Sequence, residues 1–217
     1  MTDLNAPENG LGLRRIQVRG VGRDVRPPDL AVVSVGVETR AVAAGAALAA
    51  NNIATAAVLS VLRAHGIDAR DLQTSQISVH PDHDHQTGRS IGYVVSNQLS
   101  VKIRSIGSAS SVLDAVASAG GDAIRIHGLS FELADRSQAE RAARSAAVAD
   151  ARDQAEQMSA AAGVELGPLL GISTVTHPEG GFPRPMFSAR GAAMDTVAIE
   201  GGSIDVVVEV DLVYSLR

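Results

Sequence analysis

The chain has 217 residues, of which 45% are apolar, and a formal net charge of −5. Its acidic and basic residues are mixed without a basic run, which argues against nucleic acid as a partner. The absence of cysteine excludes disulfides, thiolate metal sites and a cysteine nucleophile. With no tryptophan and three phenylalanines, the core must be built from Val, Ile, Leu and Ala, which suits Ala-rich helices lying close to a Val-rich sheet.

Residues 1–13 are polar and contain Gly, Asn and Pro, so we expect a disordered N-terminal tail. They lack the basic patch and apolar run of a secretory signal. No apolar stretch in the chain reaches the ~18–20 residues that span a bilayer. These features predict a cytoplasmic protein without membrane insertion.

Residues 14–217 are expected to form one α+β domain, with room for two lobes. Periodicity predicts strands at 14–22, 30–39, 72–85, 89–104, 123–133, 169–176 and 203–216, and helices at 42–64, 106–119 and 136–162. This order favours an antiparallel or mixed sheet with a long central hairpin and Ala-rich helices packed on one face. The Gly- and Pro-rich stretch 178–202 is typical of a functional or mobile loop.

The predicted helices carry core-facing stripes and boundary signals. The first helix is expected to turn a stripe of side chains to the core, made of Leu48, Thr55, Leu59 and Leu62, and to end at Gly66. The longest helix is expected to begin with Asp135 as its cap and Gln138 as the capping-box partner.

The register of the central hairpin follows from its turn. A three-residue loop at 86–88, with Gly88 in the left-handed conformation, keeps the apolar side chains of both strands on one face. A two-residue loop would mix the apolar and polar faces. The predicted pairs are His85–Arg89, Pro81–Tyr93 and Val79–Val95.

The hairpin tip, residues 80–85, holds three histidines and two aspartates, which are residue types that bind zinc, nickel or copper. On an extended strand, His83 and His85 share one face, and the other three residues lie opposite. Two imidazoles ~6.5–7 Å apart make at best half a metal site. A solvated turn explains the same residues more simply, so His83 and His85 are weak metal-ligand candidates.

Glycines and isolated histidines elsewhere do not form a catalytic motif. Gly20 and Gly22 follow a strand without a third glycine or a helix, so we expect a tight strand exit and not a phosphate loop. His65, His127 and His177 stand singly, without a nucleophile-elbow serine, and are expected to be structural or on the surface.

Acidic residues on the longest helix are spaced for ion pairing. The pair Asp150 and Asp153, and the pair Arg152 and Glu156, lie three and four residues apart. This spacing predicts a solvated, ion-paired face and not a glycosidase dyad. We therefore expect no enzymatic activity, no catalytic residue and no cofactor.

The segment 180–187 contains two of the three phenylalanines in a loop stiffened by proline. Aromatic side chains held in this way lose little entropy on docking. The oligomer-interface candidates are Phe182, Pro183, Pro185, Met186 and Phe187. The alternative is that both phenylalanines fold back on their own domain.

Several short motifs occur in order between residues 14 and 216. They are IQVRGVG (16–22), PDLA (28–31), GI (66–67), DLQTS (71–75), GY (92–93), NQL (97–99), ADAR (149–152), AE (155–156), GV (163–164) and LG (166–167). In this order the chain resembles SIMPL-domain proteins, which include bacterial periplasmic immunogenic and oxidative-stress-defence proteins. The resemblance implies an α+β fold, homo-oligomers that form large rings in some members, and roles in stress tolerance. It implies no catalytic residue and no cofactor.

The leading hypothesis is a non-catalytic, homo-oligomeric scaffold of more than two copies, ring- or cage-like, with the stress-related role that the resemblance implies. One alternative is a metal-binding or buffering protein that uses His83 and His85 of several copies. An enzyme of unknown class is a third, and it would need a deep pocket with convergent polar groups.

Overall fold

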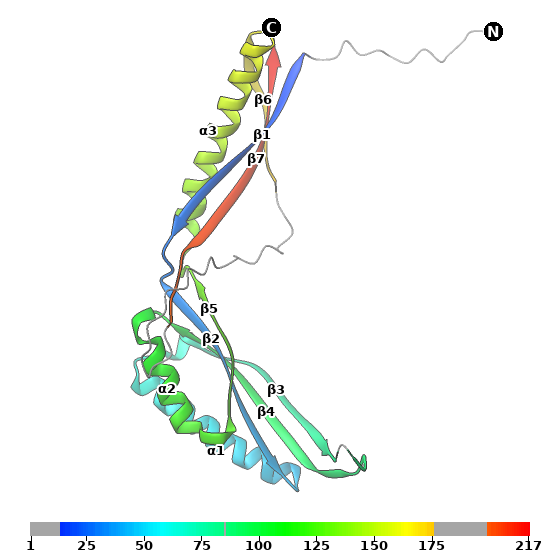
Figure 1. The fold of residues 1–217 in the computed structure, drawn as a ribbon, viewed down its shortest axis with the longest axis vertical. Coiled ribbons are helices and arrows are strands. Elements are labelled where there is room, and N and C mark those ends of the chain that lie inside the picture. Colours follow the sequence, from blue (N-terminus) through cyan, green and yellow to red (C-terminus); the bar gives the residue numbers. More distant parts are fainter. Residues whose placement is uncertain (1–13, 85, 176–198) are drawn as a thin grey trace, which may run out of the picture. The chain divides into compact units, whose positions relative to one another are not determined.

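The computed structural model describes residues 14–84, 86–175 and 199–217. These residues form two compact units (Figure 1). Unit 1 contains 14–26, 135–175 and 203–217, and unit 2 contains 27–134, without residue 85, and 199–202. Unit 2 is therefore an insertion in the chain between the first strand of unit 1 and its helix.

Unit 1 is a three-stranded antiparallel sheet with one long helix. Its strands are β1 (Arg15–Arg26), β7 (Ile204–Leu216) and β6 (Leu166–Val175), in the order β1-β7-β6. The helix α3 (Ser137–Ala161) lies along β1 and β7 and has little contact with the edge strand β6 (Figure 1). The period-two alternation predicted for the last strand is confirmed, since Ile204, Val206, Val210 and Leu212 are buried.

Helix α3 approaches β1 closely because both surfaces are made of small residues. Every fourth residue of the helix is buried: Ala139, Ala143, Ala147, Ala151, Ala155 and Ser159. On the strand, Gly20 and Gly22 face this stripe. The expectation that these glycines end a strand is wrong, because β1 continues to Arg26 and the glycines serve helix–sheet packing.

Unit 2 is a four-stranded antiparallel sheet with two helices on one face. Its strands are β2 (Leu30–Ala41), β3 (Leu72–His83), β4 (Ser90–Ile103) and β5 (Ile124–Glu132), in the order β3-β4-β2-β5. The helices are α1 (Ala44–Ala64) and α2 (Ala109–Gly120), with single 3₁₀ turns at Ala69–Asp71, Ile106–Ser108 and Gly121–Ala123. The predicted α+β class, long hairpin and one-sided helix layer are confirmed (Figure 1).

The stripe predicted for helix α1 is confirmed at Thr55, Leu59 and Leu62 and is wrong at Leu48. Its buried residues are Ala47, Asn51, Thr55, Val58 and Leu62, whereas Leu48 is 42% exposed. The helix is oriented by Asn51, whose Nδ2 donates hydrogen bonds to the carbonyl oxygens of Val37 (2.8 Å) and Val95 (3.2 Å). By length and composition alone α1 could cross a membrane, which corrects the expectation that the chain holds no such stretch.

The ends of the long helices follow known capping geometry only in part. At Gly66 (φ 79°), the backbone N–H of Ile67 donates to Leu62, a Schellman motif that confirms the predicted helix stop. At the start of α3, Asp135 accepts a hydrogen bond from the N–H of Ser137 (2.8 Å). The predicted capping box is absent, because Gln138 accepts a hydrogen bond from Arg26 instead.

The predicted hairpin register is confirmed from Gln76 to Asp82 and shifts by one residue at either end. Pro81 pairs with Tyr93 and Val79 pairs with Val95, as predicted. Between Asp82 and His83 a bulge shifts the pairing by one residue, so that the N–H of Asp84 donates to Arg89. The predicted His85–Arg89 pair is therefore replaced by Asp84–Arg89.

Candidate functional site

The hairpin tip is organised around one carboxylate. Oδ1 of Asp84 accepts hydrogen bonds from the backbone N–H of Gln86 (2.9 Å) and Thr87 (2.8 Å) and from the Thr87 hydroxyl (3.0 Å). The N–H groups of Thr87 and Gln86 hold the pKa of Asp84 below its usual range. Gly88 adopts φ 68°, as predicted from the turn. Asp84 is thus occupied in building the turn.

The metal-ligand candidates at this tip are only partly described. His83 lies at the end of β3 opposite Ser90, and His85 lies outside the described residues. Asp82, on the same strand, is within 3.7 Å of the Arg40 guanidinium. In the part of the chain that the structure describes, no three His, Asp or Glu side chains gather as metal ligands would. His177 also lies outside the described residues.

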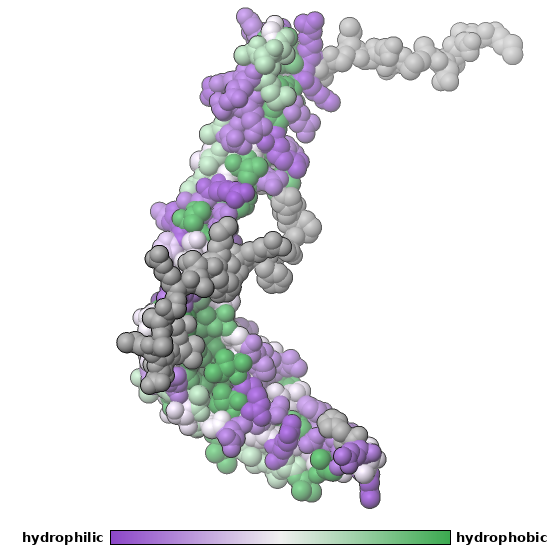
Figure 2. Space-filling model, in the orientation of Figure 1, coloured by the Kyte–Doolittle hydropathy of each residue, from purple (hydrophilic) through white to green (hydrophobic). Residues whose placement is uncertain are grey.

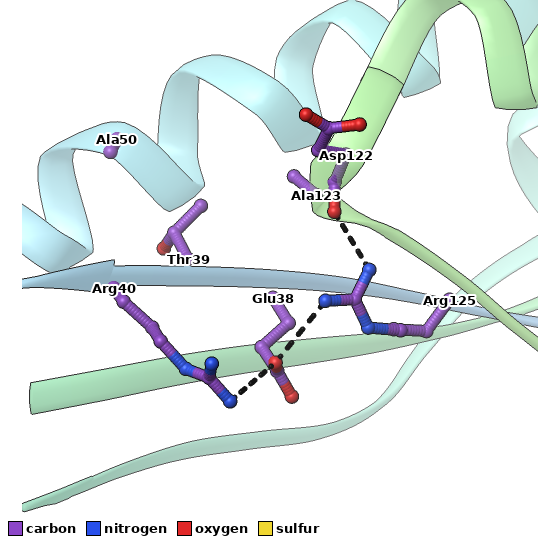
Figure 3. Close-up of a pocket in the computed structure, with 7 residues that line it drawn as sticks. All are labelled: Glu38, Thr39, Arg40, Ala50, Asp122, Ala123 and Arg125. Atoms are coloured by element: carbon purple, nitrogen blue, oxygen red, sulfur yellow. Dashed lines mark hydrogen bonds and ion pairs between the residues drawn. The ribbon is translucent and has the colours of Figure 1, made fainter. Parts of the chain in front are cut away.

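A shallow cavity of about 310 Å³ lies on unit 2 (Figure 3). Its polar lining comes from neighbouring strands: Glu38 and Arg40 on β2 and Arg125 on β5. Oε1 of Glu38 is shared by the guanidinium groups of Arg40 (3.3 Å) and Arg125 (3.5 Å), which point toward it from two sides. Arg125 also donates to the carbonyl oxygens of Asp122 and Ile124. Thr39 and Asp122 also line the cavity, and its two arginines share the single carboxylate of Glu38. The cavity is therefore a shallow polar hollow where β2 meets the start of β5.

A buried polar cluster between α1 and β4 was not predicted. Asn97 of β4 donates to the Thr55 hydroxyl (3.3 Å), which in turn donates to Oδ1 of Asn51 (3.3 Å). Among the described residues, the one buried side-chain nitrogen or oxygen without a partner is Oδ1 of Asn97. The polar residues Asn51 and Thr55 in an apolar helix were the available signal. The cluster is buried and fixes α1 on the sheet.

The outer face of the unit 1 sheet carries paired charges. Arg19 on β1 makes a two-pronged contact with Asp211 on β7, at 2.8 and 3.0 Å, and lies 3.6 Å from Glu209. The hydrogen bond from Arg19 holds the pKa of Asp211 below its usual range. Arg23 and Asp205 form a longer pair at 3.4 Å. These pairs support the β1–β7 register.

One edge strand of each sheet, β3 in unit 2 and β6 in unit 1, leaves apolar side chains uncovered. In unit 2, Ile77 and Val79 of β3 lie opposite the buried Asn97 and Val95, yet are 60% and 49% exposed. In unit 1, the exposed residues of β6 are Leu169 (47%), Leu170 (54%) and Ile172 (59%). Figure 2 shows hydrophobic residues reaching the surface in both units.

The interface candidates chosen from sequence do not belong to these surfaces. Phe182, Pro183, Pro185, Met186 and Phe187 lie outside the described residues, so their role stays a prediction. Sequence reasoning missed the β3 and β6 surfaces, because alternation predicts which side chains share a face but not how far a helix covers it.

Comparison with known proteins places the chain in a family. A family model described as "Protein of unknown function (DUF541)", named SIMPL, matches residues 16–214. The chain is 32% identical to the "26 kDa periplasmic immunogenic protein" of Brucella melitensis, over 94% of this chain and 85% of that protein. It is 28% identical to the "Uncharacterized protein YggE" of Escherichia coli K12, over 88% of this chain and 78% of that protein.

The comparisons also correct one expectation. A cytoplasmic location is contradicted by the Brucella relatives, which are named periplasmic proteins. The expectation rested on the polar character of residues 1–13 and on the supposed lack of a bilayer-spanning apolar stretch, which is weak evidence against similarity over most of the chain. The family model matches residues of both units, and the α+β fold that the resemblance implies is confirmed. The chain therefore belongs to the SIMPL family.

Proposed function

We propose that this protein is a non-catalytic, self-assembling periplasmic scaffold, a ring- or cage-like homo-oligomer of more than two copies. The observation that carries the proposal is the pair of uncovered edge strands, β3 and β6. Each is the last strand of its sheet and shows large apolar side chains to solvent. Edge strands of this kind pair or pack with other chains unless they are protected.

The two edges contrast with β1, which is the other edge of the unit 1 sheet. There the N–H of Val21, an edge residue, donates to Oδ2 of Asp150 on α3 at 2.8 Å. Arg19 and Arg23 add charge along the same strand. Val25 on β1 is also 61% exposed, so the difference lies in the charges and the Asp150 contact of β1, whereas β6 carries no charged residue.

The non-catalytic part of the proposal is supported by the direction of the pKa shifts. The pKa values of Asp71, Asp84, Asp135 and Asp211 are all lowered, by arginine partners or by turn N–H groups. Such shifts stabilise the ordinary charged form and are typical of structural ion pairs and turns. Multiple-turnover consumption of a small molecule that is lost on Glu38→Gln or Arg125→Met would contradict this part.

The periplasmic location follows the names of the relatives, and the stress-related role follows the family resemblance. Fractionation of the native host would test the location directly. Recovery of the protein with cytoplasmic markers only would contradict it. Survival of a deletion strain under oxidative challenge, compared with its parent, tests the role.

Light scattering coupled to size exclusion, followed by negative-stain microscopy, tests the assembly. We expect a mass of at least three times the 22.3 kDa chain and closed particles on the grid. Ile172→Lys on β6 is expected to lower that mass, whereas the neighbouring Ser173→Lys should not. A 22.3 kDa monomer for the unmodified protein at all concentrations would overturn the proposal.

A further inference from the structure

The exposed face of α1 lacks the charged residues that a solvent-facing helix normally carries. Of its 21 residues only Arg63, in the last turn, is charged. Ile53 is 74% exposed and Leu48 is 42% exposed, and Val42, just before the helix, is 84% exposed. The other exposed residues between 45 and 60 are Gly45, Ala46, Ala49, Ala50, Asn52, Ala56, Ala57 and Ser60.

Helix α3 of the same chain shows the opposite surface. It also packs through alanines, but seven charged residues follow its other sides: Glu140, Arg141, Arg144, Asp150, Arg152, Asp153 and Glu156. Arg152 pairs with Glu156 at 2.7 Å and Arg144 with Glu140 at 3.6 Å. This is the solvated, ion-paired face that was predicted, and it is what a helix exposed to water normally presents. The uncharged face of α1 therefore indicates a surface that is covered.

A lipid bilayer does not fit this helix as the covering partner. Asn51 and Thr55 lie on the inward face, and Asn51 is bonded to carbonyl oxygens of β2 and β4, which holds α1 on its sheet. Helices that lie on a membrane surface combine Lys and Arg with Trp or Phe. Residues 44–64 contain no lysine and no aromatic residue. The surface instead suits a protein partner that is itself small and uncharged at the contact.

We propose that the α1 face, defined as the exposed residues 45–60 of α1 together with Val42, packs against the α1 face of a second copy about a two-fold axis. An isologous contact places each residue near itself or its neighbours, so a face with like charges would repel its copy. The α1 face has no charge before Arg63. Its glycine, alanine and serine side chains allow two helices to approach closely, and Leu48 and Ile53 supply the apolar area.

The size of this face decides its place in the assembly. A 21-residue helix is ~32 Å long and ~10 Å wide, so one face offers roughly 300 Å² per copy. A stable two-chain interface buries about 800 Å² on each partner. The α1 contact is therefore one of several repeated contacts, and the inference rests on the proposed oligomer.

The absence of cysteine allows a direct geometric test. Single substitutions Ala49→Cys, Ile53→Cys and Ala56→Cys on the α1 face are compared with Ala149→Cys at an exposed position of α3. On mild oxidation of the assembled protein, we expect disulfide-linked dimers from at least one α1 variant and none from Ala149→Cys. Equal yields at both helices, or no dimer from any α1 variant, would overturn the inference.

A charge test uses the same chemical change on each helix. Ala49→Glu is expected to lower the assembled mass at least two-fold, whereas Ala149→Glu leaves it unchanged. Both positions are exposed, so circular dichroism should show the fold retained in each. If the unmodified protein is a monomer, the scaffold proposal fails as a whole. If the unmodified protein is an oligomer whose mass Ala49→Glu does not change, only the α1 inference fails. The same holds if the unmodified protein co-floats with phosphatidylcholine vesicles and Ala49→Glu abolishes that binding.

Discussion

Gly20 and Ala147 are in direct backbone contact: a Cβ added to Gly20 would overlap the carbonyl oxygen of Ala147. Gly22 stands in the same relation to Ala143, one helical turn away. The two glycines thus let α3 lie on the backbone of β1, at a distance that no residue with a side chain permits. At that distance Asp150 reaches the edge of the sheet and binds the N–H of Val21.

Gly20→Ala is therefore expected to destabilise unit 1. The added methyl group must push α3 from β1, and overpacking of this kind costs about 1–3 kcal/mol or more. The matched control is Gly171→Ala in β6, where an added Cβ meets nothing within 4 Å. Urea unfolding of both variants measures the free energies, and equal losses would show that the close contact is not a constraint.

Asp150→Ala should open the protected edge of β1. The N–H of Val21 loses its acceptor, and a hydrogen bond of this kind contributes ~1 kcal/mol or somewhat more. We expect faster hydrogen exchange at Val21 and a greater tendency to aggregate. Asp153→Ala is the control, because the Asp153 carboxylate accepts a hydrogen bond from Gln157 of the same helix and not from β1 in the described part of the chain. Unchanged exchange at Val21 would mean that the edge is protected by something else.

Asn51→Ala and Asn52→Ala compare the contributions of two adjacent asparagine side chains to the free energy of unfolding. Asn51 is 1% exposed and bonds both central strands of unit 2, whereas Asn52 lies on the side of α1 that points away from the sheet. Loss of buried hydrogen bonds at Asn51 is expected to cost about 2–3 kcal/mol, and Asn52→Ala less than about 0.5 kcal/mol. Thermal or chemical unfolding provides the comparison. A similar cost for both would contradict the role of Asn51 in fixing α1.

The ion pair between Asp71 and Arg104 predicts acid sensitivity. Arg104 donates to both carboxylate oxygens of the nearly buried Asp71, at 2.7 and 2.8 Å, and these hydrogen bonds lower the Asp71 pKa. A carboxyl with a lowered folded-state pKa stabilises the fold above its unfolded-state pKa of about 3.9, and the effect is lost as pH falls through the folded value.

Asp71→Asn is accordingly expected to lower the free energy of unfolding by about 1–2 kcal/mol at neutral pH, with a difference that shrinks as pH falls below the unfolded-state pKa of about 3.9. Asp68→Asn removes a pair in which both side chains are mostly exposed, and should change little. Unfolding curves at several pH values provide the check. If the stability difference between Asp71→Asn and the unmodified protein grew in acid, the direction assigned to the Asp71 pKa shift would be wrong.

Much of the fold can be predicted from local pattern. Some features depend only on neighbours in sequence, namely the alternation of β7 and the end of α1 at Gly66. The pairing of Val79 with Val95 depends on a single turn. Expectations failed where a distant residue competed for the same group. Gln138 accepts a hydrogen bond from Arg26, at the end of β1 and 112 residues away in sequence, instead of closing a capping box.

The candidate surfaces also divide into features set by local sequence pattern and features set by tertiary packing. The sequence by itself determined the apolar strands, the Ala-rich helices, the family motifs and the lack of charged residues from 44 to 62. Only the tertiary structure decided that Gly20 and Gly22 lie under α3, that Asn51 and not Leu48 faces the core, and that β3 and β6 remain uncovered. The reason is physical: periodicity specifies which side chains share a face, whereas burial depends on which element is packed against that face and how closely it approaches.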